Sequence, residues 1–167
     1  MIRFFIKKVG LKALPILMPQ SLSHIIIHLV FSTKDRAPFL NDAVRPQLHA
    51  YLAGVSRNAG CESFRVGGTV DHVHLAIRFS RIITIAELVE TLKTSSSKWL
   101  KSKSSELAEF GWQRGYAVFS VGPGELDLLI HYIDHQEEHH RKKSFKEEYS
   151  AFLTKYGVPF DERYVWD

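Results

Sequence analysis

The order of strand-like and helix-like segments limits this chain to a small set of folds. Short runs rich in β-branched residues predict four strands, at 24–31, 62–66, 70–79 and 116–121. Apolar residues at helical spacing predict two helices among them, from about residue 41 to Asn58 and from Thr84 to about Leu100. The chain therefore runs strand, helix, strand, strand, helix, strand, and we expect an α+β domain with an antiparallel sheet.

This order is the ferredoxin-like, or RRM-like, pattern. In that pattern the helices cover one face of the sheet and leave the other face open to a functional site. Further helices follow the fourth strand. The break Gly122-Pro123-Gly124 precedes a helix that carries Tyr132, and a last helix is expected over about Ser144 to Tyr156.

The composition shows where the excess of basic residues lies and which cellular compartment the chain suits. Residues 1–17 hold four of the 22 basic residues and none of the 18 acidic ones. We therefore expect an N-terminal extension without an assigned role and a single domain over 18–167, and we do not interpret the net charge of +4 as a nucleic-acid-binding surface. The single cysteine, Cys61, excludes a disulfide framework and favours the cytoplasm. The short apolar runs of 1–17 predict neither a secretory signal nor a membrane span.

Two histidines flank one valine in the strand at 70–79. Successive side chains of a strand point to opposite faces, so His72 and His74 share one face. Val73 and Leu75 then point to the other face, toward the core. Two neighbouring imidazoles can bind one metal ion. The alternative is a pair of half-exposed or hydrogen-bonded histidines that bind nothing.

A candidate nucleophile and a candidate third ligand lie about sixty residues downstream. Tyr132 and Gln136 are four positions apart in a segment with helical spacing, so both are expected on one side of a helix. A tyrosine hydroxyl, an amide oxygen and two imidazoles together suit a centre that cleaves phosphodiesters. The alternative for Tyr132 is a tyrosine at the edge of an amphipathic core.

Basic residues outside the extension are candidates for contact with DNA phosphates. The candidates are Lys34, Arg36, Lys93, Lys98, Lys101 and Arg114. An ordinary solvated face is the alternative for the lysines of the second helix. The charged run 137–143 is also interpreted as a solvated face, because its adjacent histidines would point about 100° apart on a helix.

These residues resemble the single-tyrosine HUH transposases, which include the REP-associated tyrosine transposases and the small insertion-sequence transposases. The resemblance extends over nearly all of residues 21–166. Its main carriers are Asp71-His72-Val73-His74-Leu75 and Tyr132-Ile133-Asp134-His135-Gln136. The first strand at 24–33 and the segments Leu92–Ser96 and Trp112–Tyr116 support it.

The resemblance implies a function and a role for each site residue. His72, His74 and Gln136 would bind a divalent cation, and Tyr132 would be the nucleophile that forms a 5′-phosphotyrosine intermediate. An open site completed by oxygen ligands suits Mg²⁺ or Mn²⁺, and the ligand types are also compatible with zinc. The protein would cut and rejoin single-stranded DNA with hairpin or palindromic ends, and it would act as a homodimer. Family dimers can exchange the tyrosine helix, and Gly122-Pro123-Gly124 forms a flexible joint before this helix. We therefore hypothesise a site that combines His72 and His74 of one subunit with Tyr132 and Gln136 of the other.

Two other functions are compatible with the sequence. The first is another HUH endonuclease, a replication initiator or a relaxase, although a chain of 167 residues has no room for the helicase or other domain that such enzymes usually carry. The second is a non-catalytic module that binds single-stranded DNA or RNA by aromatic stacking on the same fold. That function would leave the histidine pair, Tyr132 and Gln136 unexplained.

Overall fold

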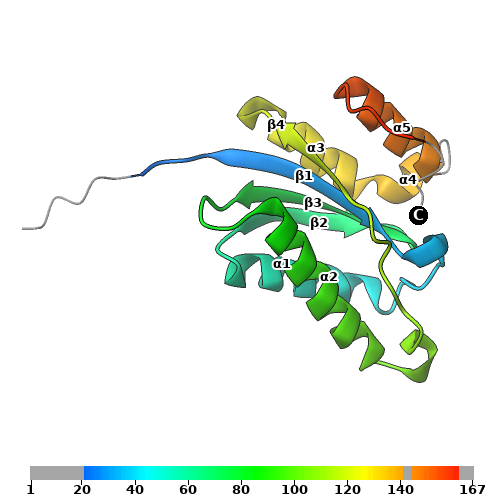
Figure 1. Ribbon diagram of the computed structural model, residues 1–167. Coiled ribbons are helices and arrows are strands. Elements are labelled where there is room, and N and C mark those ends of the chain that lie inside the picture. Colours follow the sequence, from blue (N-terminus) through cyan, green and yellow to red (C-terminus); the bar gives the residue numbers. More distant parts are fainter. Residues whose placement is uncertain (1–20, 141–143, 162–167) are drawn as a thin grey trace, which may run out of the picture.

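The computed structural model describes residues 21–140 and 144–161, and Figure 1 shows its helices and strands. The extension 1–17 lies outside the described residues. The strands are β1 (Ile25–Ser32), β2 (Glu62–Gly68), β3 (His72–Phe79) and β4 (Ala117–Val121). The helices are α1 (Arg45–Asn58), α2 (Ile85–Lys101), α3 (Leu126–Asp134), α4 (Gln136–His140) and α5 (Phe145–Lys155). Short 3-10 segments lie at Lys34–Arg36, Ser105–Leu107 and Pro123–Glu125.

The four strands form one antiparallel sheet in the order β2-β3-β1-β4. With α1 after β1 and α2 after β3, this is the ferredoxin-like, α+β arrangement that the order of segments predicts. The register of the two central strands pairs Val30 with His74 and Ser32 with His72. Both histidines therefore lie in the middle of the sheet.

Alternation along the central strands divides the sheet into two faces. Leu29, Val73 and Leu75 point to the face covered by α1 and α2, where they form the main core with leucines of both helices. His72 and His74 point to the other face, as the period of two predicts. Among the described residues, no helix has both the length and the apolar character needed to cross a membrane.

The ends of the elements follow local chemistry. Thr84 and Glu87 form the capping box that opens α2, and Gly60, with a φ of +74°, follows the end of α1. Strand β2 runs through Gly67 and Gly68, although a pair of glycines between two strand-like runs is typical of a turn. At Gly68, with a φ of +147°, a Cβ atom would lie 2.2 Å from the carbonyl oxygen of His72, so only glycine fits there.

The face that carries the histidines is covered, whereas the strand order predicts an open face. Figure 1 shows α3, α4 and α5 on the side of the sheet opposite α1 and α2. A second apolar cluster joins α5 to the sheet, and its buried residues are Val30, Ala117, Phe119, Phe145, Tyr149 and Leu153. The histidines consequently lie between the sheet and a layer of helices.

Candidate metal and tyrosine site

His72 and His74 lie side by side on β3. Their ring centroids are 5.0 Å apart, and neither residue has exposed surface. The Nδ1 atom of His72 lies 2.7 Å from Oδ1 of Asp71, and since a carboxylate only accepts hydrogen bonds, this nitrogen carries the proton. The Nδ1 atom of His74 lies 2.9 Å from Nε2 of His28. Each imidazole can therefore present Nε2 to a shared centre while its other nitrogen is held.

Asp71 is itself held by neighbours. The guanidinium of Arg36 pairs with the Asp71 carboxylate, and the hydroxyl of Thr69 donates to Oδ1 of Asp71 at 3.0 Å. Burial alone would raise the pKa of Asp71, but the hydrogen bond from His72 and the charges of His72 and Arg36 hold it well below its usual range. Arg36, a candidate DNA contact, thus also supports the orientation of His72.

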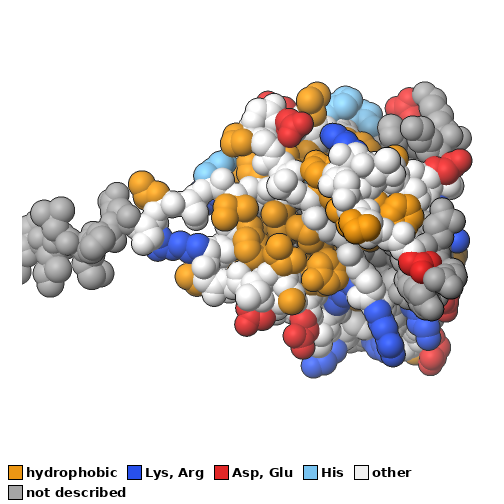
Figure 2. All heavy atoms as spheres, turned by 45° about the horizontal axis from the view of Figure 1, so that its top comes forward, with side chains coloured by type: hydrophobic (Ala, Val, Ile, Leu, Met, Phe, Trp, Pro, Cys, Tyr) orange, Lys and Arg blue, Asp and Glu red, His pale blue; other side chains and the backbone are white. Residues whose placement is uncertain are grey.

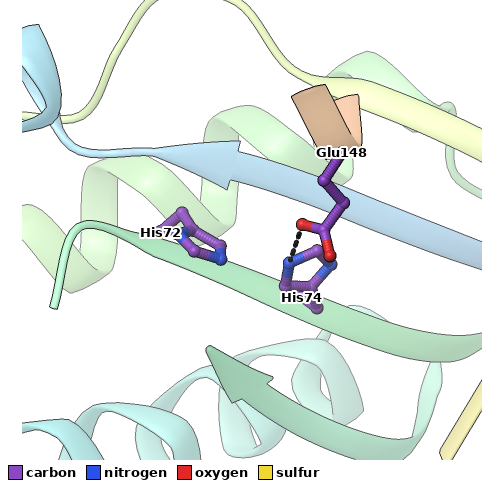
Figure 3. A group of neighbouring side chains, drawn as sticks. All are labelled: His72, His74 and Glu148. Atoms are coloured by element: carbon purple, nitrogen blue, oxygen red, sulfur yellow. Dashed lines mark ion pairs between the residues drawn. The ribbon is translucent and has the colours of Figure 1, made fainter. Parts of the chain in front are cut away.

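Glu148 on α5 joins the two histidines and was not predicted from the sequence. His72, His74 and Glu148 each offer one ligand atom, and these atoms lie within 4.8 Å of one another. Figure 3 shows the carboxylate reaching from α5 toward His74, with Oε2 of Glu148 at 3.9 Å from Nε2 of His74. A glutamate between Phe145 and Tyr149 on the buried side of a helix was the signal that could have identified it.

Gln136 lies at the same centre, as its sequence motif predicts. It is 1% exposed, and its Oε1 lies 3.2 Å from Nε2 of His72. The same oxygen lies 3.1 Å from Nε2 of His140, and that nitrogen lies 3.4 Å from Oε2 of Glu148. The interpretation of 137–143 as a solvated face is therefore wrong for His140, because α4 turns this side chain inward against the ring of His72.

Tyr132 lies over the histidines of its own chain. Its ring centroid is 5.6 Å from that of His74 and 5.9 Å from that of His28. Burial, and then the negative charge of Glu148, raise the pKa of the Tyr132 hydroxyl. A single chain thus brings together the predicted nucleophile and the predicted ligands, whereas the resemblance predicts a site shared between two subunits.

Burial and neighbouring groups shift the pKa values of the ionisable side chains at this centre. It lowers the pKa of His28 to about 4, although the charge of Glu148 opposes this shift. Burial, and then the neighbouring histidines, lower the pKa of His74 well below its usual value. For Glu148, burial would raise the pKa, but hydrogen bonds from His140 and Tyr132 lower it below the usual value. A carboxylate beside imidazoles and an amide oxygen is a donor set that fits a divalent cation.

The six candidate DNA contacts occupy different environments. Lys34, Lys98, Lys101 and Arg114 are exposed, and Figure 2 shows Lys and Arg side chains gathered at the lower right of that view. Lys93 differs, because its Nζ donates to three carbonyl oxygens of the loop 113–115 at 2.7 to 3.1 Å. Burial also lowers the pKa of Lys93 to about 8. Its ammonium group therefore holds the loop.

A cavity of about 450 Å³ lies next to the histidines. Its walls include Arg36, Gln113, Tyr116, Phe145 and Tyr149. The ring of Phe145 connects it with the centre, since its centroid lies 4.6 Å from that of His72. The guanidinium carbon of Arg36 lies 4.5 Å from the centroid of the same Phe145 ring. Aromatic faces and a cation thus line a space beside the candidate ligands.

Comparison with known proteins identifies the family. Residues 21–136 match the family described as IS200-like transposases. The chain belongs to this family. The IS200-like transposase fold is also found in a protein of Deinococcus radiodurans R1 assigned as a transposase, with a TM-score of 0.56 and 24% identity over 71% of this chain and 98% of that one. No curated protein matches the sequence.

A second solved structure has the same fold as this IS200-like transposase. It is a REP-associated tyrosine transposase bound to a REP hairpin, with a TM-score of 0.55 and 12% identity. The match covers 74% of this chain and 72% of that one.

Proposed function

We propose that this IS200-like transposase cuts and rejoins single-stranded DNA through Tyr132, with Mg²⁺ or Mn²⁺ bound by His72, His74 and Gln136. The observation that carries the proposal is the position of Tyr132, whose ring lies 5.6 Å from that of His74. Membership of the transposase family supports the reaction class. The convergence of a hydroxyl, two imidazoles and an amide oxygen at one buried centre supports the mechanism.

The reaction begins when Oη of Tyr132 attacks a phosphorus atom of the DNA backbone. The bond from the tyrosine oxygen to phosphorus forms, and the bond from phosphorus to the 3′ oxygen of the adjoining nucleotide breaks. The proton lost by Tyr132 is balanced by the proton that the departing 3′ oxygen takes up to become a 3′-hydroxyl. Because burial and Glu148 raise the pKa of Tyr132, the hydroxyl is protonated at neutral pH and loses its proton during the attack. A bound divalent cation would supply Lewis-acid polarisation of a phosphate oxygen. The phosphotyrosine bond conserves the energy of the diester, so a 3′-hydroxyl can later displace Tyr132 and rejoin DNA.

The proposed substrate is single-stranded DNA that carries a hairpin or palindromic end. The REP-associated relative was solved with a REP hairpin. In this chain Lys34, Lys98, Lys101 and Arg114 would contact the backbone, and binding should weaken as salt rises. The cavity walled by Tyr116 and Phe145 would receive an unpaired base by stacking. We propose that the protein acts as a homodimer.

A labelled hairpin oligonucleotide with single-stranded flanks tests the proposal. In the presence of Mn²⁺ the wild type should become covalently linked to the label, whereas Tyr132→Phe should bind the oligonucleotide without becoming linked. His72→Ala and added chelator should both prevent cleavage, and the fully paired duplex should not be cut. A labelled adduct on Tyr132→Phe would show that another residue attacks. Binding by the wild type without any cleavage would favour a non-catalytic module.

A further inference from the structure

Glu148 occupies a position on α5 where the other buried residues are apolar or aromatic. Those residues are Phe145, Tyr149 and Leu153, and Glu148 itself is 5% exposed. Moving a carboxylate out of water is unfavourable unless its charge is compensated. The aromatic neighbours on α5 provide no charge. Compensation must therefore come from the groups that face α5 from the sheet, α3 and α4, including the hydroxyl of Tyr132.

The two imidazoles among those groups lie near Glu148 but are too distant for strong hydrogen bonds. Oε2 of Glu148 lies 3.4 Å from Nε2 of His140 and 3.9 Å from Nε2 of His74, whereas charge-assisted hydrogen bonds measure about 2.7 to 2.9 Å. Within the described part of the chain, the buried Nε2 of His74 has no hydrogen-bond partner. Figure 3 shows His72, His74 and the carboxylate facing a common region. Acceptor atoms that converge in this way suit a cation between them.

We propose that Glu148 binds the same cation as His72 and His74, so that metal binding fastens α5 to the sheet. This inference rests on the proposed function and adds an anionic oxygen ligand, which suits Mg²⁺ and Mn²⁺. Helix α5 lies beyond the residues 21–136 that match the family. The C-terminal helix thereby becomes part of the metal centre, and DNA cleavage requires it to be in place.

Calorimetric titration of the full-length, metal-free protein with Mn²⁺ tests the ligand. Glu148→Gln removes the charge while keeping the size, and it should weaken Mn²⁺ binding about tenfold or more. Glu90→Gln, at an exposed position of α2, is the matched control and should bind as the wild type does. His74→Ala should lose binding as well.

Each result of the titration has a distinct meaning. Wild-type affinity in Glu148→Gln alone would overturn the inference, and the loss of cleavage in that variant would then assign Glu148 to Tyr132 and not to the metal. Wild-type affinity in His74→Ala would overturn the proposed metal site and the inference together.

Hydrogen exchange of the wild type tests the fastening without any variant. Mn²⁺ should slow exchange of the backbone amides of α5 (Phe145–Lys155), and the exchange of α1, on the opposite face, should change less. In Glu148→Gln the slowing in α5 should disappear. If the amides of wild-type α5 exchange at the same rate with and without bound Mn²⁺, the inference is overturned. This measurement needs no variant, so it decides the question even if Glu148→Gln fails to fold.

Discussion

Gly67 of β2 determines how closely α3 approaches the sheet. A Cβ atom at this position would lie 2.5 Å from Cγ2 of Ile133 and 2.9 Å from its carbonyl oxygen. Such contacts are shorter than van der Waals packing allows, so only glycine permits the observed approach. Because Tyr132 directly precedes Ile133, the missing side chain at 67 also helps to place Tyr132 over His74.

We expect Gly67→Ala to lower the free energy of unfolding by about 2 kcal/mol, because α3 must move away from β2. Gly124→Ala is the matched control, since a Cβ atom there would meet no atom within 4 Å. Urea unfolding measures the difference in stability, and DNA cleavage should fall only in Gly67→Ala. Equal stability of the two variants would show that α3 adjusts to the added methyl group.

His49 of α1 should make stability depend on pH. Burial, and then the charge of Arg45, lower its pKa to about 4, whereas an unfolded chain has a histidine pKa of about 6.5. Between these values the unfolded chain binds a proton that the folded chain does not, so stability falls as the pH drops from about 6.5 to about 4. We expect His49→Gln to remove on the order of 2 kcal/mol of this fall, with part of the full effect screened by solvent. Urea unfolding of the metal-free protein across this range gives both curves, and parallel curves would exclude His49 as the cause.

The residues of the site differ in how far the sequence could predict them. His72 and His74 follow from the period of a strand, and Tyr132 and Gln136 follow from their motif. Glu148 reaches the centre only through the packing of α5 on the sheet, which no local pattern specifies. Its one sequence signal is a charged residue within an apolar helical stripe.

The break between α3 and α4 is a feature of the helices that the sequence does not predict. The helical spacing of Tyr132 and Gln136 predicts one helix, but His135, with a φ of −106° and a ψ of 20°, separates two. The Nδ1 atom of His135 lies 2.7 Å from the carbonyl oxygen of His131. Neither a glycine nor a proline lies at this break, and the apolar periodicity of the sequence continues through it. The sequence therefore does not predict that the helix ends here. The longer elements, α2 and the central strands, were predicted correctly because capping and periodicity agree there.

Two lysines of α2 should respond differently to replacement by methionine. Lys93→Met removes three hydrogen bonds to the loop 113–115, and we expect a loss of about 2 kcal/mol in the free energy of unfolding. Lys98→Met should leave stability unchanged, since this side chain is exposed. It should instead weaken DNA binding. The slope of log affinity against log salt concentration should also fall in magnitude by about one. Urea unfolding and binding titrations at several salt concentrations separate the two effects, and similar stability losses would contradict the assignment of Lys93 to the loop.

At the scale of the molecule, the sheet is covered on both faces. The strand order predicts helices on one face only, and it does so correctly for α1 and α2. The helices that follow β4 carry apolar residues of their own, and those residues must be buried against something. Val30, Ala117 and Phe119 of the second face provide the surface for α5. The face that the strand order predicts to be open is therefore covered by helices.

A mixed dimer of Tyr132→Phe and His72→Ala chains tests whether sites are built within one chain. The structure places Tyr132 against His74 of the same chain, so each site of the mixed dimer keeps one lesion and the mixture should remain inactive. Cleavage of the hairpin oligonucleotide by a verified mixed dimer measures this. Recovered cleavage would mean that α3 is exchanged between subunits in the cleaving state.

The order of the site residues along the chain has a consequence for biosynthesis. His72 and His74 are made first, Tyr132 follows, and Glu148 comes after them. Because synthesis proceeds from the N-terminus, the central strands can pair before Tyr132 exists. A nascent chain that has reached β3 but not α3 carries the paired histidines without Tyr132, the residue that we propose joins the protein to DNA. Under the proposed function, the capacity to cut a DNA strand is therefore acquired late in translation, after the central strands of the sheet.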